Sequence, residues 1–163
     1  MPAKTQQLQI RVTPRQKAAL KRLARAAGRD VSSYVLARLV PEGSNRFAGI
    51  LDTVARATDY RYALAELNDF LAGLPALEFS DAVASANLAR LSPYLQNYVA
   101  AMVEQAANAK QATPPTWVGD TVPLESPRFA TELSSLRVHL LLSAPVPFKR
   151  RNIFVDAAVG ARV

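Results

Sequence analysis

Apolar and polar residues alternate one by one near the start of the chain, up to the Thr13-Pro14 step. Alternation with a period of two predicts a β-strand that has one apolar face and one polar face. The apolar face would be formed by Leu8, Ile10 and Val12, and the polar face by Gln7, Gln9 and Arg11. No second strand pattern follows nearby, so the sequence shows no partner strand for it.

The pattern then changes to helical spacing. Thr13 before a proline is a typical helix start, because the hydroxyl caps the first turn and proline suits the first helical position. Gly28 suits the left-handed position that ends this helix. Asp30 suits the cap of a second helix, which Pro41 and Gly43 would end. The apolar stripes of the two helices are Leu20, Leu23, Ala24 and Ala27, and then Val31, Val35 and Leu39.

One strand and two short helices are not expected to be stable alone. The strand's backbone N–H and C=O groups would lack partners, and three elements over about forty residues bury too little surface. The chain has no cysteine and therefore no disulfide. We expect a homodimer in which two copies of the strand pair antiparallel above four helices. Its core would contain Leu8, Ile10, Val12, Leu20, Leu23, Val35 and Leu39.

Helical spacing dominates residues 43–112, for which we expect a small helical bundle. The pattern predicts three or four helices between residues 45 and 111. One would be closed by Gly73 and Pro75, one would run from about Ser80 to Arg90, and a long one would begin after Ser92. Nothing in this stretch points to chemistry of its own, so we interpret it as structural.

Prolines interrupt the remaining residues, 113–163. Four of them lie between residues 114 and 127 and predict a proline-rich, partly extended tail, with a short helix from about Ala130 to Ser143. The only tryptophan, Trp117, is expected to anchor either a partner or the chain's own bundle. A basic triplet at residues 149–151 precedes the strand-like NIFV, and such a segment could become ordered on a partner.

Charge is concentrated at one end of the chain. The net charge is +7, and residues 1–41 hold nine basic residues against one acidic residue. This asymmetry favours an anionic partner, most often nucleic acid, over a merely solvated basic face. Without cysteine, a long apolar run or a signal-type leader, the chain is expected to be a soluble cytoplasmic protein that does not bind a membrane.

The sequence offers little for catalysis. His139 is the only histidine and lies in an apolar run, and there is no cysteine nucleophile. A glycine-rich phosphate loop, a dense carboxylate cluster and a serine elbow are also missing from the sequence. We therefore expect no enzyme activity, no cofactor and no metal site.

Three motifs follow one another over residues 4–41: the alternating QLQIRV, the helix TPRQKAALKRLA and the turn GRDVSSYV. Together they resemble the ribbon-helix-helix family of DNA-binding proteins. The resemblance implies a ribbon in the major groove, where Gln and Arg can contact adenine and guanine edges, and a phosphate at the N-terminus of the second helix. Asp30 departs from this pattern, because a carboxylate repels phosphate, and we interpret it as a helix cap. Base contacts would come from Gln7, Gln9 and Arg11, and phosphate contacts from Lys4, Arg15, Arg29, Val31, Ser32 and Ser33.

A second set of motifs extends over residues 113–163, namely PPTWV, PLESPRF and SLRVHLLLSAPVPFKRRNIFVDA. It is similar to the C-terminal part of antitoxin-like proteins that are encoded beside abortive-infection nucleotidyltransferase toxins. The resemblance implies that this part of the chain binds a toxin. The candidate contacts are Trp117, Phe148, Lys149, Arg150, Arg151 and Phe154.

These observations lead to one hypothesis of fold and function. The fold is expected to be mainly α, with a ribbon-helix-helix segment at residues 1–42, a helical domain at 43–112 and a proline-rich partner-binding segment at 113–163. The protein would bind double-stranded operator DNA as a dimer or higher oligomer, repress its own promoter and neutralise a toxin, with a nucleotidyltransferase as the candidate. The alternatives are a stand-alone ribbon-helix-helix transcriptional regulator, including one that senses a small molecule, and a protein-interaction module without a toxin.

Overall fold

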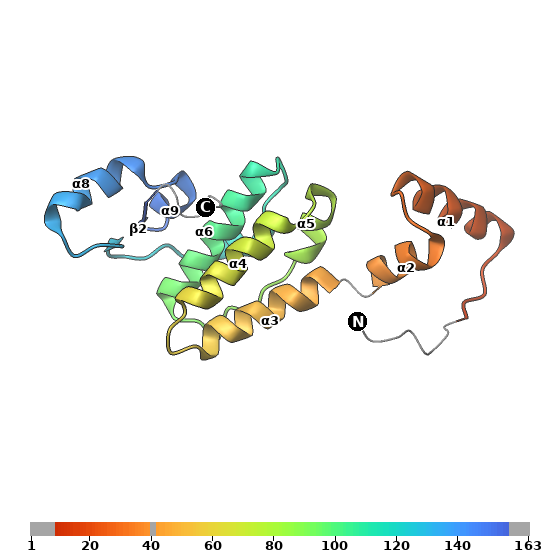
Figure 1. Cartoon of the computed structure of the whole chain (residues 1–163), viewed down its shortest axis with the longest axis horizontal. Helices are drawn as coiled ribbons and strands as arrows, with labels where there is room; N and C mark the ends of the chain where they lie inside the picture. The colour runs from red at the N-terminus through yellow and green to blue at the C-terminus, as the bar shows by residue number, and fades with distance from the viewer. Residues whose placement is uncertain (1–8, 40–41, 157–163) are drawn as a thin grey trace. The chain divides into compact units, whose positions relative to one another are not determined.

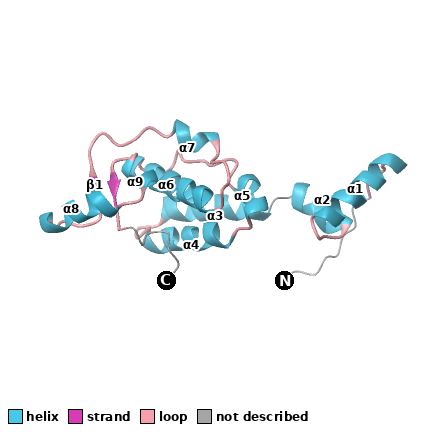
Figure 2. Ribbon diagram, turned by 90° about the horizontal axis from the view of Figure 1, so that it is seen from above, coloured by secondary structure: helices cyan, strands magenta, loops and turns pink. Residues whose placement is uncertain are grey.

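A computed structural model describes residues 9–39 and 42–156 of the chain (Figure 1). The chain divides into two compact units, Met1–Pro41 and Glu42–Val163, and each is described by itself. Helices dominate both units (Figure 2). Within the described residues, the strands are limited to two short segments of the second unit, β1 (Arg128–Phe129) and β2 (Ile153–Phe154).

The first unit is a pair of short helices, α1 (Pro14–Ala26) and α2 (Val31–Leu39). The predicted caps are confirmed. The Thr13 hydroxyl accepts a hydrogen bond from the Gln16 backbone N–H, and the Gln16 side chain accepts one from the Thr13 backbone N–H at 2.8 Å, which completes a capping box. Gly28 follows α1 with a φ of +64°, a left-handed conformation that favours glycine.

The predicted ribbon is wrong. Residues 9–13 form no strand, and the first regular element of the described chain is α1, which begins at Pro14. A strand is held by hydrogen bonds to a neighbouring strand, and the described part of the first unit contains only helices. The alternation of Ile10 and Val12 with polar neighbours therefore leads to an irregular segment, and these two apolar side chains are exposed. Gln7 and Leu8 lie outside the described residues.

The second unit begins with four helices, as the sequence predicts for this stretch: α3 (Glu42–Arg56), α4 (Arg61–Gly73), α5 (Ala76–Ala82) and α6 (Pro93–Ala109). Helix α3 packs on α4 and α5, and α4 packs on α6 (Figure 1). The core between them is continuous. It contains Phe47 of α3, Leu67 of α4, Phe79 of α5, and Val99 and Val103 of α6, all with essentially no exposed surface.

Two boundaries in this bundle differ from the predictions. The predicted helix from Ser80 to Arg90 is wrong, because α5 ends at Ala82 and a loop follows it. In that loop the Asn87 side chain accepts a hydrogen bond from the Ala89 backbone N–H, a local turn that competes with helix. Gly43 does not end a helix but lies at the start of α3, where a Cβ atom would come within 2.9 Å of the Ala82 Cβ. Glycine therefore allows α3 to approach α5 closely.

The C-terminal segment is folded rather than partly extended, so this part of the predicted fold class is also corrected. It contains α7 (Thr116–Asp120), α8 (Ser134–Ser143) and α9 (Val146–Lys149) in addition to β1 and β2, which pair in parallel. Helices α7 and α9 begin directly after Pro115 and Pro145. These prolines therefore start helices, since their fixed φ suits the position before a first turn. Phe148 and Ile153 belong to the same buried core as α6.

Candidate functional site

The first unit presents a dense set of cations. Lys17, Lys21 and Arg25 follow one another at four-residue spacing along α1, so they share one face of the helix, and all three are exposed. Asp30 is the only acidic residue in residues 1–41, so few negative charges offset this face. Further exposed cations on or beside the two helices are Arg11, Arg15, Arg22 and Arg29.

The N-terminus of α2 is occupied by a side chain of the chain itself. The Asp30 carboxylate accepts hydrogen bonds from the Ser33 backbone N–H at 2.9 Å and from the Ser33 hydroxyl at 2.5 Å. These hydrogen bonds, that of the hydroxyl first, hold the pKa of the Asp30 carboxyl below its usual value. The interpretation of Asp30 as a helix cap is thus confirmed. The Asp30 carboxylate therefore occupies two hydrogen-bond donors of Ser33, a residue that the sequence analysis expects to contact a phosphate.

The apolar side chains of the first unit are poorly covered. In the described part of this unit only Ala24 is buried. Four large apolar side chains remain between 42% and 57% exposed, and we call them the exposed apolar set: Ile10, Val12, Leu23 and Leu36. Leu20 and Val35 of the predicted dimer core are half-buried, Leu8 lies outside the described residues, and the surroundings of the Leu39 side chain are likewise not described.

Most of the predicted DNA contacts that the structure describes lie at the surface of the first unit. Gln9, Arg11, Arg15, Arg29 and Ser32 are exposed, and Val31 and Ser33 are half-buried at the start of α2. Gln7 and Lys4 fall outside the described residues. Leu36 is not among the residues predicted for the dimer core, although it stands directly beside Val35 of the predicted stripe.

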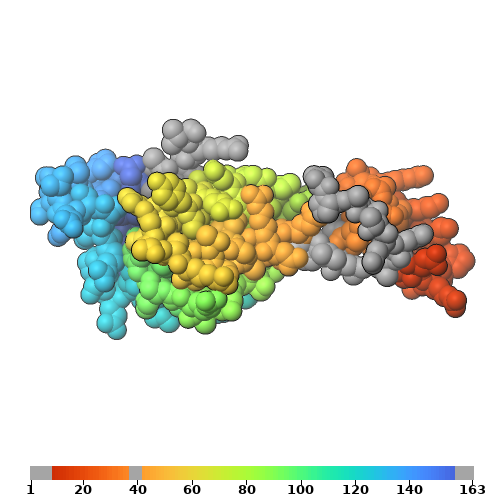
Figure 3. Space-filling view, turned by 60° about the horizontal axis from the view of Figure 1, so that its bottom comes forward, coloured from red at the N-terminus to blue at the C-terminus, as the bar shows by residue number. Residues whose placement is uncertain are grey.

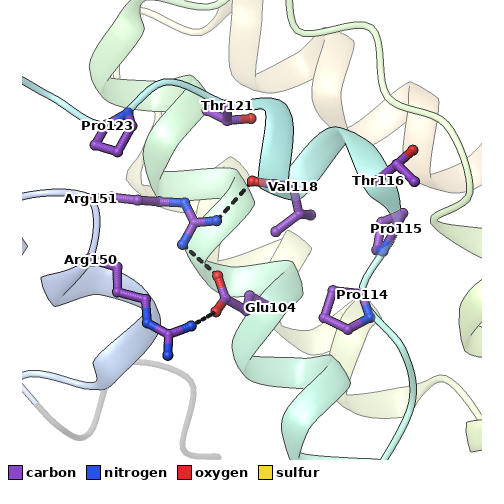
Figure 4. Close-up of a pocket in the computed structure, with 10 residues that line it drawn as sticks. Glu104, Pro114, Pro115, Thr116, Val118, Thr121, Pro123, Arg150 and Arg151 are labelled. Carbon is purple, nitrogen blue, oxygen red and sulfur yellow. Dashed lines mark hydrogen bonds and ion pairs between the residues drawn. The ribbon is translucent and has the colours of Figure 1, made fainter.

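The second unit contains a nearly buried carboxylate that two arginines hold (Figure 4). Glu104 of α6 contacts Arg151 at 2.5 Å and Arg150 at 3.2 Å, and the side chain of Glu104 is 11% exposed. The two arginines differ in environment, with side-chain exposures of 7% for Arg151 and 69% for Arg150. Arg151 also donates to the carbonyls of Pro147 and Val118, so it joins α6, α7 and α9.

A pocket of about 480 Å³ opens beside this ion pair. Its walls combine the two arginines with Pro114, Pro115 and Pro123. Trp117 of the neighbouring α7 points into the unit, where its indole N–H donates to the Val83 carbonyl at 2.9 Å. Trp117 is thus anchored to the chain's own bundle, one of the two roles that the sequence left open.

The other candidate toxin contacts differ widely in accessibility. Phe148 is fully buried, as is almost all of Arg151. Lys149 and Phe154 are half-buried, and the Phe154 ring stacks on the Phe129 ring with centroids 4.9 Å apart. Arg150 is exposed. Of these candidate contacts, a partner that approaches the folded unit therefore reaches mainly Arg150.

No group of three or more His, Cys, Asp or Glu residues in the described part of the chain could hold a metal ion. No helix in residues 9–39 and 42–156 combines the length and apolar character that crossing a membrane requires.

In comparisons with known proteins, residues 7–59 match the family model described as Antitoxin TacA 1-like. The matched residues include both helices of the first unit and continue through α3. The match supports an antitoxin role in a toxin–antitoxin system, and with it a toxin as partner. No curated protein and no solved structure matches the chain.

Proposed function

We propose that this protein is a non-enzymatic antitoxin whose first unit binds operator DNA as a dimer and whose second unit holds the toxin. The family match supports the antitoxin role. The observation that carries DNA binding is the placement of nine basic residues and one acidic residue in residues 1–41. Operator binding by an antitoxin would repress the promoter that drives its own expression. A nucleotidyltransferase is the candidate toxin, because the C-terminal motifs resemble those of antitoxin-like proteins encoded beside such toxins.

The exposed cations of α1 suit a phosphate backbone. Lys17, Lys21 and Arg25 share one helix face and can each contact a phosphate. Each such contact favours binding, because a cation that neutralises a phosphate releases condensed counterions into solution. Such contacts position a protein without reading sequence. Gln9 and Arg11 precede this helix and are exposed, and their side chains offer the bidentate geometry that base edges require. We therefore assign base readout to these two residues.

The exposed apolar set supports dimerisation. Ile10, Val12, Leu23 and Leu36 are each more than 40% exposed on a unit whose described part buries only Ala24. A second copy that covers this set would provide the missing core, since a unit this small buries too little surface alone. A dimer also places two copies of the cationic face on DNA, as a palindromic operator requires.

Replacing Gln9 or Arg11 by alanine is expected to weaken specific operator binding by about 1–3 kcal/mol per contact, because each loses a base-edge contact. The measurement is a titration of labelled operator and of an unrelated duplex of equal length at fixed salt. Lys21→Ala is the matched control, since loss of a phosphate contact lowers affinity for both duplexes equally. An equal loss on both duplexes for the Gln9 and Arg11 variants would refute the base-readout assignment.

Asp30→Asn is expected to strengthen DNA binding by about threefold to tenfold at low salt, because it removes the negative charge at the start of α2. Asparagine caps helices as well as aspartate does, so the fold of the unit should persist. Asp30→Ala is the control that removes the charge and the cap together, and its thermal midpoint should fall. The gain in affinity should shrink as salt is raised. Unchanged affinity at every salt concentration would mean that no phosphate approaches α2 here.

A further inference from the structure

Helix α8 is apolar on most sides and yet almost fully exposed. Leu140 is its only buried residue. Val138 is 62% exposed, Leu141 44% and Leu142 77%. Half of the ten residues of α8 are large and apolar, a proportion that a neighbouring element normally covers, and large exposed apolar patches on a protein mark interaction sites. Figures 1 and 3 show α8 at the edge of the second unit, away from α3, α4 and α5.

The exposed residues of α8 form a coherent face. Val138, Leu141 and Leu142 are spaced at i, i+3 and i+4 and therefore lie side by side on the helix. Val138 and Leu142 each differ from the buried Leu140 by two positions, which places them on roughly the opposite side of the helix. We call these three residues the α8 face. Leu133 and Val146, which flank the helix, are also exposed, at 62% and 58%.

Two cations lie beside the α8 face. Of the four basic residues in 133–155, Arg150 and Arg151 pair with Glu104, which leaves Arg137 and Lys149, and the acidic residues Glu132 and Asp156 flank this stretch. The Arg137 guanidinium lies 5.2 Å from the centre of the Phe129 ring, and the Lys149 ammonium donates to the Leu142 carbonyl at 2.8 Å, so both cations are held beside the face. The Asp156 carboxylate lies 3.9 Å from the Nε2 atom of His139 on the same helix. The complementary surface is therefore apolar in its centre and carries acidic groups opposite Arg137 and Lys149.

We propose that the α8 face is the toxin-docking surface and that it enters an apolar groove on the toxin that carries acidic groups opposite Arg137 and Lys149. This inference rests on the proposed antitoxin function, which the family match supports. A second copy of the chain fits the face less well, because an interface of two identical surfaces would bring Arg137 and Lys149 close to their own copies. The exposed apolar set of the first unit already provides a surface for a second copy.

The test uses the full chain and the products of the two reading frames that flank its own. Each product is expressed with and without the chain, and the one whose expression arrests growth is purified as the probe. Leu142→Asp is expected to weaken binding of this probe at least about tenfold, as central residues of interfaces do, and to lose relief of growth arrest. Leu77→Asp is the matched control, since Leu77 of α5 is 93% exposed and belongs to the same unit. It should bind as the unchanged chain does.

The outcomes separate this inference from the proposed function. If neither flanking product arrests growth, or if the unchanged chain relieves no arrest, the proposed function fails and the inference with it. If the chain relieves the arrest and Leu142→Asp binds the probe normally, the inference fails while the proposed function stands. If Leu142→Asp instead lowers the mass of the free chain, the face joins two copies and the inference is overturned. Hydrogen exchange of the unchanged complex should show protection of residues 134–143 and gives a readout that needs no variant.

Discussion

Replacing Glu104 by alanine is expected to lower the free energy of unfolding of the second unit by about 3–5 kcal/mol, because the variant leaves a buried guanidinium without its counter-charge. Arg151 is 7% exposed and fixed by carbonyls of Pro147 and Val118, so it cannot turn outward without breaking those hydrogen bonds. The measurement is urea unfolding followed by far-UV circular dichroism, with the slope of the transition checked against that of the unchanged chain.

Two control variants distinguish the effect of a buried ion pair on stability from the effect of an exposed one. Arg150→Ala removes the other partner of Glu104, but Arg150 is 69% exposed, so the loss should stay below about 1 kcal/mol. Asp52→Ala breaks the exposed pairs with Arg56 and Arg90 on the same unit, and its effect should be equally small. A similar loss for all three variants would show that the buried position of Arg151 does not decide the outcome.

A double variant tests whether the buried charge itself is responsible. Glu104→Leu combined with Arg151→Met removes both charges and keeps the volume similar, a change that is often tolerated in buried ion pairs. We expect it to be more stable than Glu104→Ala, although it leaves the Val118 and Pro147 carbonyls without their donor. A double variant that is no more stable than Glu104→Ala would assign the loss to these carbonyls and not to the charge.

Features that depend on near neighbours in the sequence were predictable. The caps at Thr13, Asp30 and Ser92 each involve residues three positions apart, and the left-handed glycine at position 28 follows from the end of a single helix. Three of the four helices of residues 42–109, namely α3, α4 and α6, follow in the same way from apolar spacing within each helix. Such signals are complete within a short window, so a sequence can display them without knowledge of the fold.

Features that depend on distant residues were not predictable. The alternation around Ile10 and Val12 describes a strand only if a neighbour offers backbone hydrogen bonds, and the described part of the first unit offers none. The Arg151–Glu104 pair joins residues 47 positions apart, and the Trp117–Val83 hydrogen bond spans 34 positions. Nothing local distinguishes Arg151 from a surface cation, although the apolar residues that follow it are consistent with an interior position.

Apolar residues that remain exposed in the folded protein are the hardest feature to predict from sequence. The segment SSLRVHLLLS predicts a helix, and α8 is one, but its apolar residues point in several directions and suggest a buried helix. The structure leaves most of α8 exposed instead. The candidate contacts that the sequence placed in the basic triplet and its neighbours are in part interior residues, so the docking surface that we propose lies on α8 instead.

Leu23→Asp is expected to separate the proposed dimer and to reduce operator affinity at least about 100-fold. The variant places a charge within the exposed apolar set, where Leu23 is 47% exposed, so it should disturb association more than the fold of α1. The measurement combines sedimentation equilibrium with operator titrations between low and moderate salt. Because the slope of log K against log salt is about −0.9 per phosphate neutralised, a monomer that carries one cationic face should show about half the slope of the dimer.

Tyr62→Asp on α4 is the matched control for this experiment, since Tyr62 is 81% exposed but belongs to the second unit. It should keep both the mass and the salt slope of the unchanged chain. Leu36→Asp changes the same apolar set from α2 and should repeat the effect of Leu23→Asp. The slope is decisive because a partly misfolded sample lowers the apparent affinity without halving the slope. A monomeric Leu23→Asp variant that keeps the full slope would show that one copy alone makes all the phosphate contacts, and the proposed dimeric mode of DNA binding would be wrong.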